Sequence, residues 1–224
     1  MTELITLSPI TDGVATLTLN RPEKKNALSI ALRDAISDVL VQLSADEDLR
    51  VLVITGSGET FCAGFDLDEF RDTQPSFQRK LWESSDRFHH SVLRFPLPVV
   101  AGVNGAALAG GFDLAALCDL RLASTAARFA HPEQRFGDVM YAPLRDLVGG
   151  ATARELCLTG RSIDAAEAFR LGLVSAVVDP PAFPAALAAL AAEIAQAPRR
   201  NLMRTKAKFI AAAAIPVTTQ TLDI

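Results

Sequence analysis

The segment Asn104-Gly-Ala-Ala-Leu-Ala-Gly-Gly-Phe-Asp-Leu-Ala-Ala-Leu-Cys-Asp119 decides how the middle of this chain folds. The apolar run Val99–Val103 stands directly before it and predicts a buried strand. The glycine pair Gly110-Gly111 then opens an apolar helix that we expect to end at Leu117. Small residues here leave the first backbone N–H groups of the helix open to a ligand, at the positive end of the helix dipole. The alternative is that the glycines only let the helix start pack closely on the strand.

Outward from this segment, strands alternate with helices. Residues 4–7 and 14–19 predict a hairpin around an Asp12-Gly13 turn, residues 51–54 predict a buried strand, and Ser29 is the expected N-cap of a helix. Residues 61–66 predict a tight loop. The remaining predicted strands are residues 120–123, 128–130 and 174–178, and the remaining predicted helices are residues 76–93, 165–171, 185–197 and 201–214. This alternation is typical of an α/β fold, so we expect a core over residues 1–178 and a helical C-terminal region over residues 179–224.

Composition narrows the class of protein. Half of the 224 residues are apolar and 21% are charged, which suits a compact globular chain. The net charge of −4 gives no electrostatic reason to expect nucleic acid or an anionic membrane surface as a partner. Cys62, Cys118 and Cys157 are an odd number without close pairing, which indicates unpaired thiols in a reducing compartment. The sequence shows no signal-peptide pattern and no run of about twenty apolar residues, so we expect a cytoplasmic protein.

Two acidic residues twenty positions apart, Asp113 and Glu133, are the strongest sign of catalysis. Taken alone, Asp113 is explained equally well as a partner of the helix N-terminus, and Glu133 as an exposed loop acid. A second glycine-containing turn, Phe61-Cys-Ala-Gly-Phe-Asp-Leu67, offers a backbone N–H donor at Phe65 beside the one at Gly110. Two converging donors make an oxyanion hole, and each stabilises a transition state by roughly 3 kcal/mol. The combination of two carboxylates and two such turns favours an enzyme.

Several common ligand-binding motifs do not occur in the sequence. Phe112-Asp113 follows the glycine pair where a Walker site needs Lys-Ser/Thr, and the stretch at residues 56–58 lacks the third glycine of a dinucleotide fingerprint. The Gly-x-Ser-x-Gly motif of hydrolases is also missing. His89 and His90 have no Cys, Asp or Glu at ligand spacing, so we expect them on the surface of a polar helix rather than in a metal site.

Two further polar groups remain open between a structural and a functional interpretation. His131 lies two residues before Glu133 and could line the same pocket, although a structural role is favoured. Arg21, Lys24 and Lys25 form a basic cluster that is either a solvated loop or a contact for ligand phosphates.

A set of stretches, taken in order, resembles the enoyl-CoA hydratase/isomerase (crotonase) superfamily over nearly the whole chain. They are Asn20-Arg-Pro with Asn26-Ala-Leu, Phe61-Cys-Ala-Gly-Phe-Asp-Leu, Asn104-Gly with Gly-Gly-Phe-Asp-Leu-Ala and Cys-Asp, Pro132-Glu, and Leu158-Thr-Gly-Arg with Ala165-Ala-Glu-Ala and Leu171-Gly-Leu-Val. Each motif is loose, but their order and spacing together are specific. The resemblance implies a spiral of ββα units forming two packed sheets. It also implies a helical C-terminal region that builds trimers, often paired into hexamers.

The same resemblance implies an acyl-CoA thioester as the ligand. Phe65 and Gly110 match the two positions whose N–H groups bind the thioester oxygen, and Asp113 and Glu133 match the two acids of the hydratases, at the same separation. No metal is implied, and no cofactor other than the coenzyme A of the substrate. The residues matched to binding of the substrate and its coenzyme A are Lys24, Lys25, Ala27, Ala63, Phe65, Asp66, Leu67, Asp68 and Gly110.

The sequence departs from the family pattern at three places. Asp113 stands where hydratases usually carry glutamate, so its carboxylate should lie roughly 1 Å farther from a water, and such a displacement can cost about a hundredfold in rate. Gly137-Asp-Val-Met-Tyr-Ala-Pro-Leu replaces the glycine-rich stretch that normally follows Pro-Glu and shapes the acyl pocket. The chain stops at Ile224, earlier than typical members, which predicts an unusual assembly or the loss of a neighbour's contacts with coenzyme A.

We therefore expect hydration of a 2-enoyl-CoA to a 3-hydroxyacyl-CoA, with both acids holding one water and the oxyanion hole stabilising an enolate-like intermediate. One alternative is enoyl-CoA isomerisation, decarboxylation or thioester hydrolysis, with Glu133 as the main base. Another is acyl-CoA binding without catalysis. The expected assembly is a homotrimer or a dimer of trimers, with acyl-CoA as ligand and neither nucleic acid nor membrane as a partner.

Overall fold

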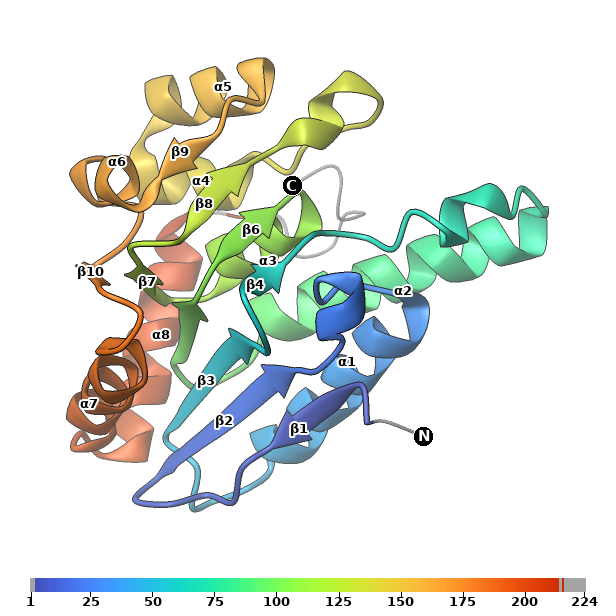
Figure 1. The fold of residues 1–224 in the computed structure, drawn as a ribbon. Coiled ribbons are helices and arrows are strands. Elements are labelled where there is room, and N and C mark those ends of the chain that lie inside the picture. Colours follow the sequence, from blue (N-terminus) through green and yellow to red (C-terminus); the bar gives the residue numbers. More distant parts are fainter. Residues whose placement is uncertain (1–2, 214, 216–224) are drawn as a thin grey trace.

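The structure is a computed structural model that describes residues 3–213 and 215. Its core contains two sheets (Figure 1). In the larger sheet, of order β1-β2-β3-β5-β7-β10, β1 pairs antiparallel with β2, and the pairs from β2 to β10 are parallel. The antiparallel pairing of β1 with β2 confirms the predicted hairpin, and Asp12 and Gly13 adopt the positive φ angles that such a turn needs. The strands of this sheet are β1 (Ile5–Leu7), β2 (Val14–Leu19), β3 (Val51–Gly56), β5 (Val99–Val103), β7 (Leu120–Ser124) and β10 (Ala176–Val178).

The smaller sheet has the order β4-β6-β8-β9, and its strands are β4 (Thr60–Cys62), β6 (Ala106–Leu108), β8 (Arg128–Ala130) and β9 (Ile163–Asp164). Each of β4, β6 and β8 follows a strand of the larger sheet, and a helix follows in turn. This repetition is the predicted ββα spiral, so the α/β prediction is confirmed. The predicted loop over residues 61–66 was wrong at its start, which belongs to β4. Strands of two or three residues are too short to show an alternating pattern in the sequence.

Helices surround the sheets, and most begin close to their predicted positions. The side chain of Ser29 caps the first long helix by accepting a hydrogen bond from the N–H of Leu32, as predicted. Residue 214, the predicted end of the last helix, lies outside the described residues. The α-helices are α1 (Ile30–Ser44), α2 (Pro75–Leu93), α3 (Gly110–Leu117), α4 (Ala142–Val148), α5 (Gly150–Thr159), α6 (Ala165–Arg170), α7 (Phe183–Ala195) and α8 (Arg199–Ala213), and the 3₁₀ turns are η1 (Pro22–Lys24), η2 (Glu69–Arg71) and η3 (Pro132–Arg135).

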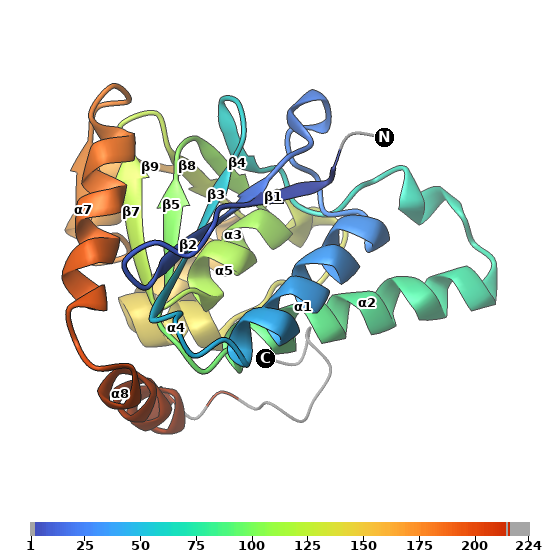
Figure 2. The ribbon, with the colours of Figure 1, turned by 90° about the horizontal axis from the view of Figure 1, so that it is seen from below.

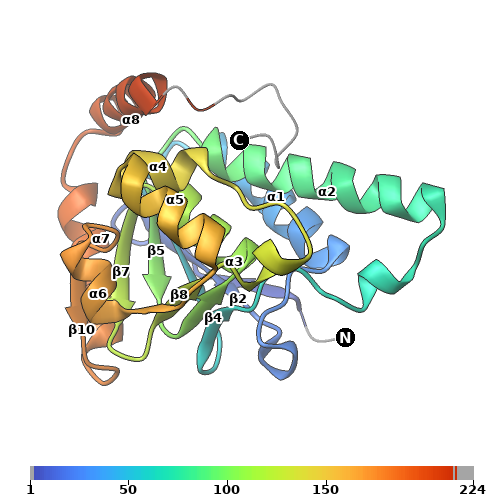
Figure 3. The ribbon, with the colours of Figure 1, turned by 90° about the horizontal axis from the view of Figure 1, so that it is seen from above.

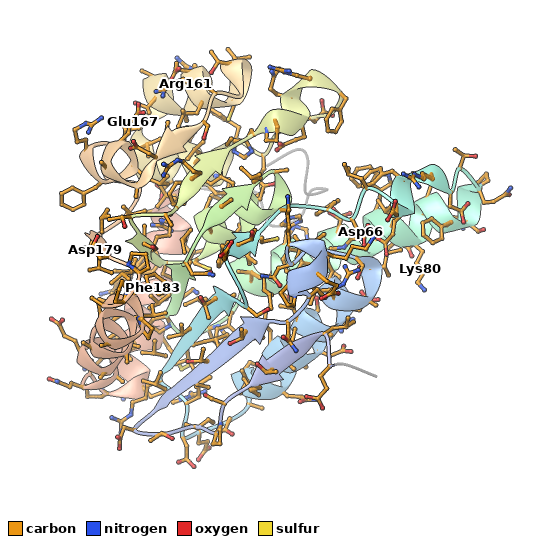
Figure 4. All side chains as sticks on the ribbon, in the orientation of Figure 1. Asp66, Lys80, Arg161, Glu167, Asp179 and Phe183 are labelled. Atoms are coloured by element: carbon orange, nitrogen blue, oxygen red, sulfur yellow. The ribbon has the colours of Figure 1, made fainter. Side chains whose placement is uncertain are left out.

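The larger sheet is buried on both faces, which explains why its central strands read as continuous apolar runs. One face packs against α1, α2 and α3, whereas α7 lies on the opposite side (Figure 2). Val53 and Phe183 belong to a separate apolar cluster under α7, and Figure 4 labels Phe183. A Cβ at Gly102 would lie 2.3 Å from Leu187 of α7, so this glycine lets the helix approach the sheet. The predicted boundary at residue 178 coincides with the end of β10 and stays a prediction.

A buried ion pair ties α8 to the core. Nζ of Lys206 lies 2.7 Å from Oδ2 of Asp119 and donates to the backbone oxygen of Leu97 at 3.0 Å.

The three cysteines are free thiols, with Cys62 and Cys118 buried. Within residues 3–213 and 215, no helix is long and apolar enough to cross a membrane.

Candidate active site

The backbone of Phe65 presents an unused N–H group. Leu28 pairs with Phe65 in a parallel bridge, in which the N–H of Leu28 donates to the oxygen of Gly64 and the N–H of Asp66 donates to the oxygen of Leu28. In this pairing the N–H of Phe65 itself points away from Leu28. Within the described part of the chain, nothing accepts a hydrogen bond from it.

The first N–H group of α3 is unused in the same way. Ala109 precedes the helix with a φ of 51° and a ψ of −130°, a conformation that is costly for a residue with a side chain. Its own N–H donates to the oxygen of Ala130, while its oxygen accepts from Phe112 and Asp113. Gly110 therefore begins the helix with an N–H that no described residue accepts from. Strain of this kind is often found at functional sites.

The two unused donors lie side by side, and both segments depend on glycine there. A Cβ at Gly64 would lie 3.3 Å from the nitrogen of Gly110, and a Cβ at Gly110 would lie 2.9 Å from two ring carbons of Phe65. The next glycine has a different task, because a Cβ at Gly111 would lie 2.2 Å from the oxygen of Cys62. Gly111 therefore allows close packing, and Gly110 begins the helix with an N–H that no described residue uses. Its use by a ligand stays a prediction.

The side chains of Asp113 and Glu133 both lie close to the imidazole of His131. Asp113 stands in the first turn of α3 and Glu133 in the first turn of η3. Nδ1 of His131 lies 2.8 Å from Oε1 of Glu133 and 3.9 Å from Oδ1 of Asp113. The imidazole is 2% exposed and stacks on Phe112 at 4.5 Å between ring centroids. The sequence favoured a purely structural role for His131, whereas the structure places it in contact with Glu133 and next to Asp113.

Burial controls the protonation of this cluster. It raises the pKa of Asp113 to about 7, with a smaller contribution from the charge of Glu133 and an opposing one from His131. Burial lowers the pKa of His131, but the hydrogen bond to Glu133 and the charges of Asp113 and Glu133 outweigh it, so the net shift is upward. Oε2 of Glu133 is buried and has no hydrogen-bond partner among the described residues. An unpartnered carboxylate oxygen beside a carboxyl that titrates near neutrality is suited to proton transfer.

Two buried polar residues behind Phe65 were not identified from the sequence as part of the site. The guanidinium of Arg33 in α1 lies 4.4 Å from the centroid of the Phe65 ring and donates to the oxygens of Leu28 and Leu81. His89 in α2 stacks on the ring of Phe65 itself, with 6.0 Å between the two ring centroids. Its predicted place on the surface was wrong: it is buried, and burial lowers its pKa to about 3. A basic residue on the apolar face of α1 was the available signal for Arg33.

The predicted coenzyme A residues lie in two neighbouring loops. The N–H of Ala63 donates to the oxygen of Lys25, and the oxygen of Ala27 accepts from Arg21. Arg21 also pairs with Asp66, which Figure 4 labels on the segment after β4. Further along, Lys24 of η1 lies 3.0 Å from Asp68, with both side chains about half exposed, and Leu67 is exposed. The structure thus brings the two loops together, and their contact with coenzyme A stays a prediction.

Two helices from the segment after Glu133, α4 and α5, lie close to the acids. Figure 3 shows α4 and α5 next to α3, the helix that carries Asp113. Cys157 of α5 is close enough to both acids for their charges to raise its pKa, after burial, to about 11. A hollow of about 960 Å³ lies elsewhere, between α7 and the larger sheet, and none of the predicted site residues lines it.

Comparison with known proteins shows the family of this chain. The family described as Enoyl-CoA hydratase/isomerase matches residues 9–224. The chain belongs to this family. It is 34% identical to (E)-benzylidenesuccinyl-CoA hydratase of Thauera aromatica, over 88% of this chain and 78% of the relative. It is 36% identical to a short-chain-enoyl-CoA hydratase of Clostridium acetobutylicum, over 75% of this chain and 66% of the relative.

Solved structures of enoyl-CoA hydratases share the fold. The enzyme from Bacillus anthracis matches with a TM-score of 0.90 at 30% identity, over 96% of this chain and 85% of that chain. The enzyme from Mycobacterium smegmatis matches with a TM-score of 0.88 at 36% identity, over the same shares of the two chains. These matches confirm the crotonase fold predicted from the motifs.

Proposed function

We propose that this member of the family adds water to the double bond of a 2-enoyl-CoA and forms a 3-hydroxyacyl-CoA. The observation that carries the proposal is the linked pair Asp113 and Glu133 near two adjacent, unused N–H groups, those of Phe65 and Gly110. A hydration needs both parts, because one stabilises negative charge and the other moves two protons.

The oxyanion hole supplies the electrostatic part of catalysis. The thioester oxygen accepts from the N–H groups of Phe65 and Gly110, and each donor stabilises the developing negative charge by roughly 3 kcal/mol. The positive end of the α3 dipole adds to this effect at Gly110. Since Arg33 contacts the ring of Phe65 and the oxygen of Leu28, the donor is held in place before substrate binds.

The two carboxyl groups divide the proton transfers. Oε2 of Glu133 takes a proton from water while the water oxygen bonds to C3 of the substrate, and the electrons of the C2–C3 double bond move toward the thioester oxygen. Asp113 is protonated for part of the time at neutral pH, since its pKa is about 7, and gives its proton to C2 as the carbonyl re-forms. Glu133 then returns its proton to solvent and Asp113 regains one, so that one water is consumed per turnover.

The shorter acid favours one alternative reaction. The side chain of Asp113 makes no hydrogen bond to a described residue and is one methylene shorter than glutamate. In an enoyl-CoA isomerase, or in a decarboxylase or thioester hydrolase of this family, Glu133 alone acts as the main base. Binding of acyl-CoA without turnover is the remaining alternative, and each of the three predicts a different result in the assay below.

The test is turnover of crotonyl-CoA and longer 2-enoyl-CoAs by the purified protein, followed as loss of the enone absorbance. Glu133→Gln should lower kcat by about 10² to 10⁴. Asp113→Asn should impair hydration severely but leave an isomerase largely active. Glu83→Gln, an exposed acid of α2, is the matched control and should behave as wild type. No turnover of any thioester, together with tight binding in calorimetry, would leave only the binding protein.

Binding and assembly follow the same proposal. The coenzyme A of the substrate lies along the loops of Lys24, Lys25, Ala27 and Ala63 and of residues 65–68, and the reaction uses no other cofactor and no metal. The protein works in the cytoplasm as a homotrimer or a dimer of trimers, which sedimentation measurements can test. Support comes from the family match, although the chain spans only about two thirds to four fifths of the lengths of its curated relatives.

A further inference from the structure

His131 occupies the place where the two acidic elements meet. It lies between β8 and η3, and the bond from the N–H of Ala109 to the oxygen of Ala130 ties this point to the start of α3. Its imidazole is held on one face by Phe112, at 4.5 Å and with 23° between the ring planes. Because the ring is buried and stacked, it has little freedom to turn.

The contacts of His131 make the two oxygens of Glu133 unequal. An ionised carboxylate oxygen only accepts hydrogen bonds, so Nδ1 of His131 is the donor in the 2.8 Å bond to Oε1. Oε2 has no partner among the described residues. The oxygen left for a water or a substrate proton is therefore Oε2, and His131 determines which way it points.

The charge of His131 also acts on Asp113. The 3.9 Å distance from Nδ1 to Oδ1 is too long for a hydrogen bond but short enough for a strong electrostatic effect. Two thiols also lie near the acids: that of Cys62 in β4 near Asp113, and that of Cys157 in α5 near both. Burial raises their pKa values to about 12 and about 11. These thiols stay neutral at physiological pH, which leaves His131 as the group whose charge offsets the two carboxylates within the described cluster.

We propose that His131 is a positioning residue of this site: its Nδ1–H fixes Oε1 of Glu133 so that Oε2 faces the reacting water, and its charge keeps Asp113 and Glu133 together. The proposal rests on hydration as the proposed function. It assigns His131 no direct contact with substrate.

Two variants separate the hydrogen bond from the charge. His131→Asn places an amide nitrogen as many bonds from Cβ as Nδ1, so it keeps a donor but loses the charge. His131→Leu keeps a similar shape and loses both. We expect the Leu variant to lower kcat for crotonyl-CoA by about 10- to 100-fold with little change in KM, and the Asn variant to recover most of kcat. Leu40→Ala, which removes a buried side chain of α1 that is not among the site residues, should lower the melting temperature and leave kcat unchanged.

A second readout does not depend on turnover. In protein labelled with ¹³C at the carboxyl groups, both His131 variants should shift the NMR titration of Asp113 to higher pH, because a positive charge that lowers this pKa is lost. An unmoved titration, equal kcat in the Leu variant and wild type, or an equal kcat loss in Leu40→Ala would each overturn the inference. If wild type does not hydrate any thioester, the proposed function fails, and the titration still decides the role of His131.

Discussion

Replacing Gly110 by alanine tests the oxyanion hole directly. The added Cβ would lie 2.9 Å from Cδ1 and Cε1 of Phe65, about 0.5 Å inside an ordinary contact of 3.4 Å or more. The ring cannot easily give way, because Arg33 lies against it at 4.4 Å and His89 stacks nearby. Relief of the overlap must therefore move Phe65 or tilt the first turn of α3, and either movement displaces one of the two N–H donors.

The expected loss follows from the value of one donor. Losing an oxyanion-hole hydrogen bond lowers kcat by about 10² to 10³, which corresponds to about 2.7–4 kcal/mol. The change acts on the transition state more than on the bound substrate, so KM should stay nearly constant. Alanine is a better helix former than glycine by roughly 1 kcal/mol, so the fold should survive.

Steady-state hydration of crotonyl-CoA, measured with thermal melting of the same samples, gives the answer. Gly150→Ala is the matched control, since it also changes the first residue of a helix and its Cβ would meet nothing closer than 3.6 Å. It should keep wild-type kcat. A Gly110→Ala enzyme whose kcat stays within about threefold of wild type, or whose loss lies entirely in KM, would refute the placement of the donors.

Three further predictions concern stability and binding. Burial raises the pKa of Asp113 from 3.8 to about 7, so the wild-type protein loses free energy of unfolding as the pH rises from 4 toward 7, by about 1.4 kcal/mol per pKa unit. Asp113→Asn lacks this titration, so its free energy of unfolding in urea should rise relative to that of wild type between pH 5 and pH 8. A difference between the two proteins that does not change with pH would contradict this. Arg33→Met removes the buried, charge-assisted hydrogen bonds to the oxygens of Leu28 and Leu81 and should cost about 3 kcal/mol in urea unfolding. The exposed Arg87→Met should change stability by less than about 0.5 kcal/mol. Lys24→Ala should raise KM for acyl-CoA severalfold at low salt and less at high salt, with kcat unchanged. Asp68→Ala frees the Lys24 ammonium and should lower KM. If KM of each variant equals that of wild type at both salt concentrations, Lys24 does not contact a phosphate.

The fold was largely predictable because its signals are local. Long apolar runs such as Val99–Val103 and a clear cap such as Ser29 act over a few residues, and the structure confirms both elements. The order of loose motifs was sufficient to indicate the family. Of the smaller sheet, the predicted strand over residues 128–130 is confirmed as β8, whereas β4, β6 and β9 were missed. Two or three residues carry no periodic pattern, and the pairing of such short strands depends on neighbours far away in the sequence.

For the candidate site too, some features could be predicted from the sequence and others only from the structure. The sequence alone determined which residue types are available: two acids at a fixed separation, and glycines where N–H groups must stay accessible. Only the tertiary structure decided that His131 joins Glu133 and lies beside Asp113, and that Arg33 and His89 are buried around Phe65. Burial and distance belong to the folded chain, since they arise when α1, α2, α3 and η3 pack together. The pKa of a carboxyl and the direction of a hydrogen bond depend on both quantities, so the protonation of this site could not be read from the order of its residues.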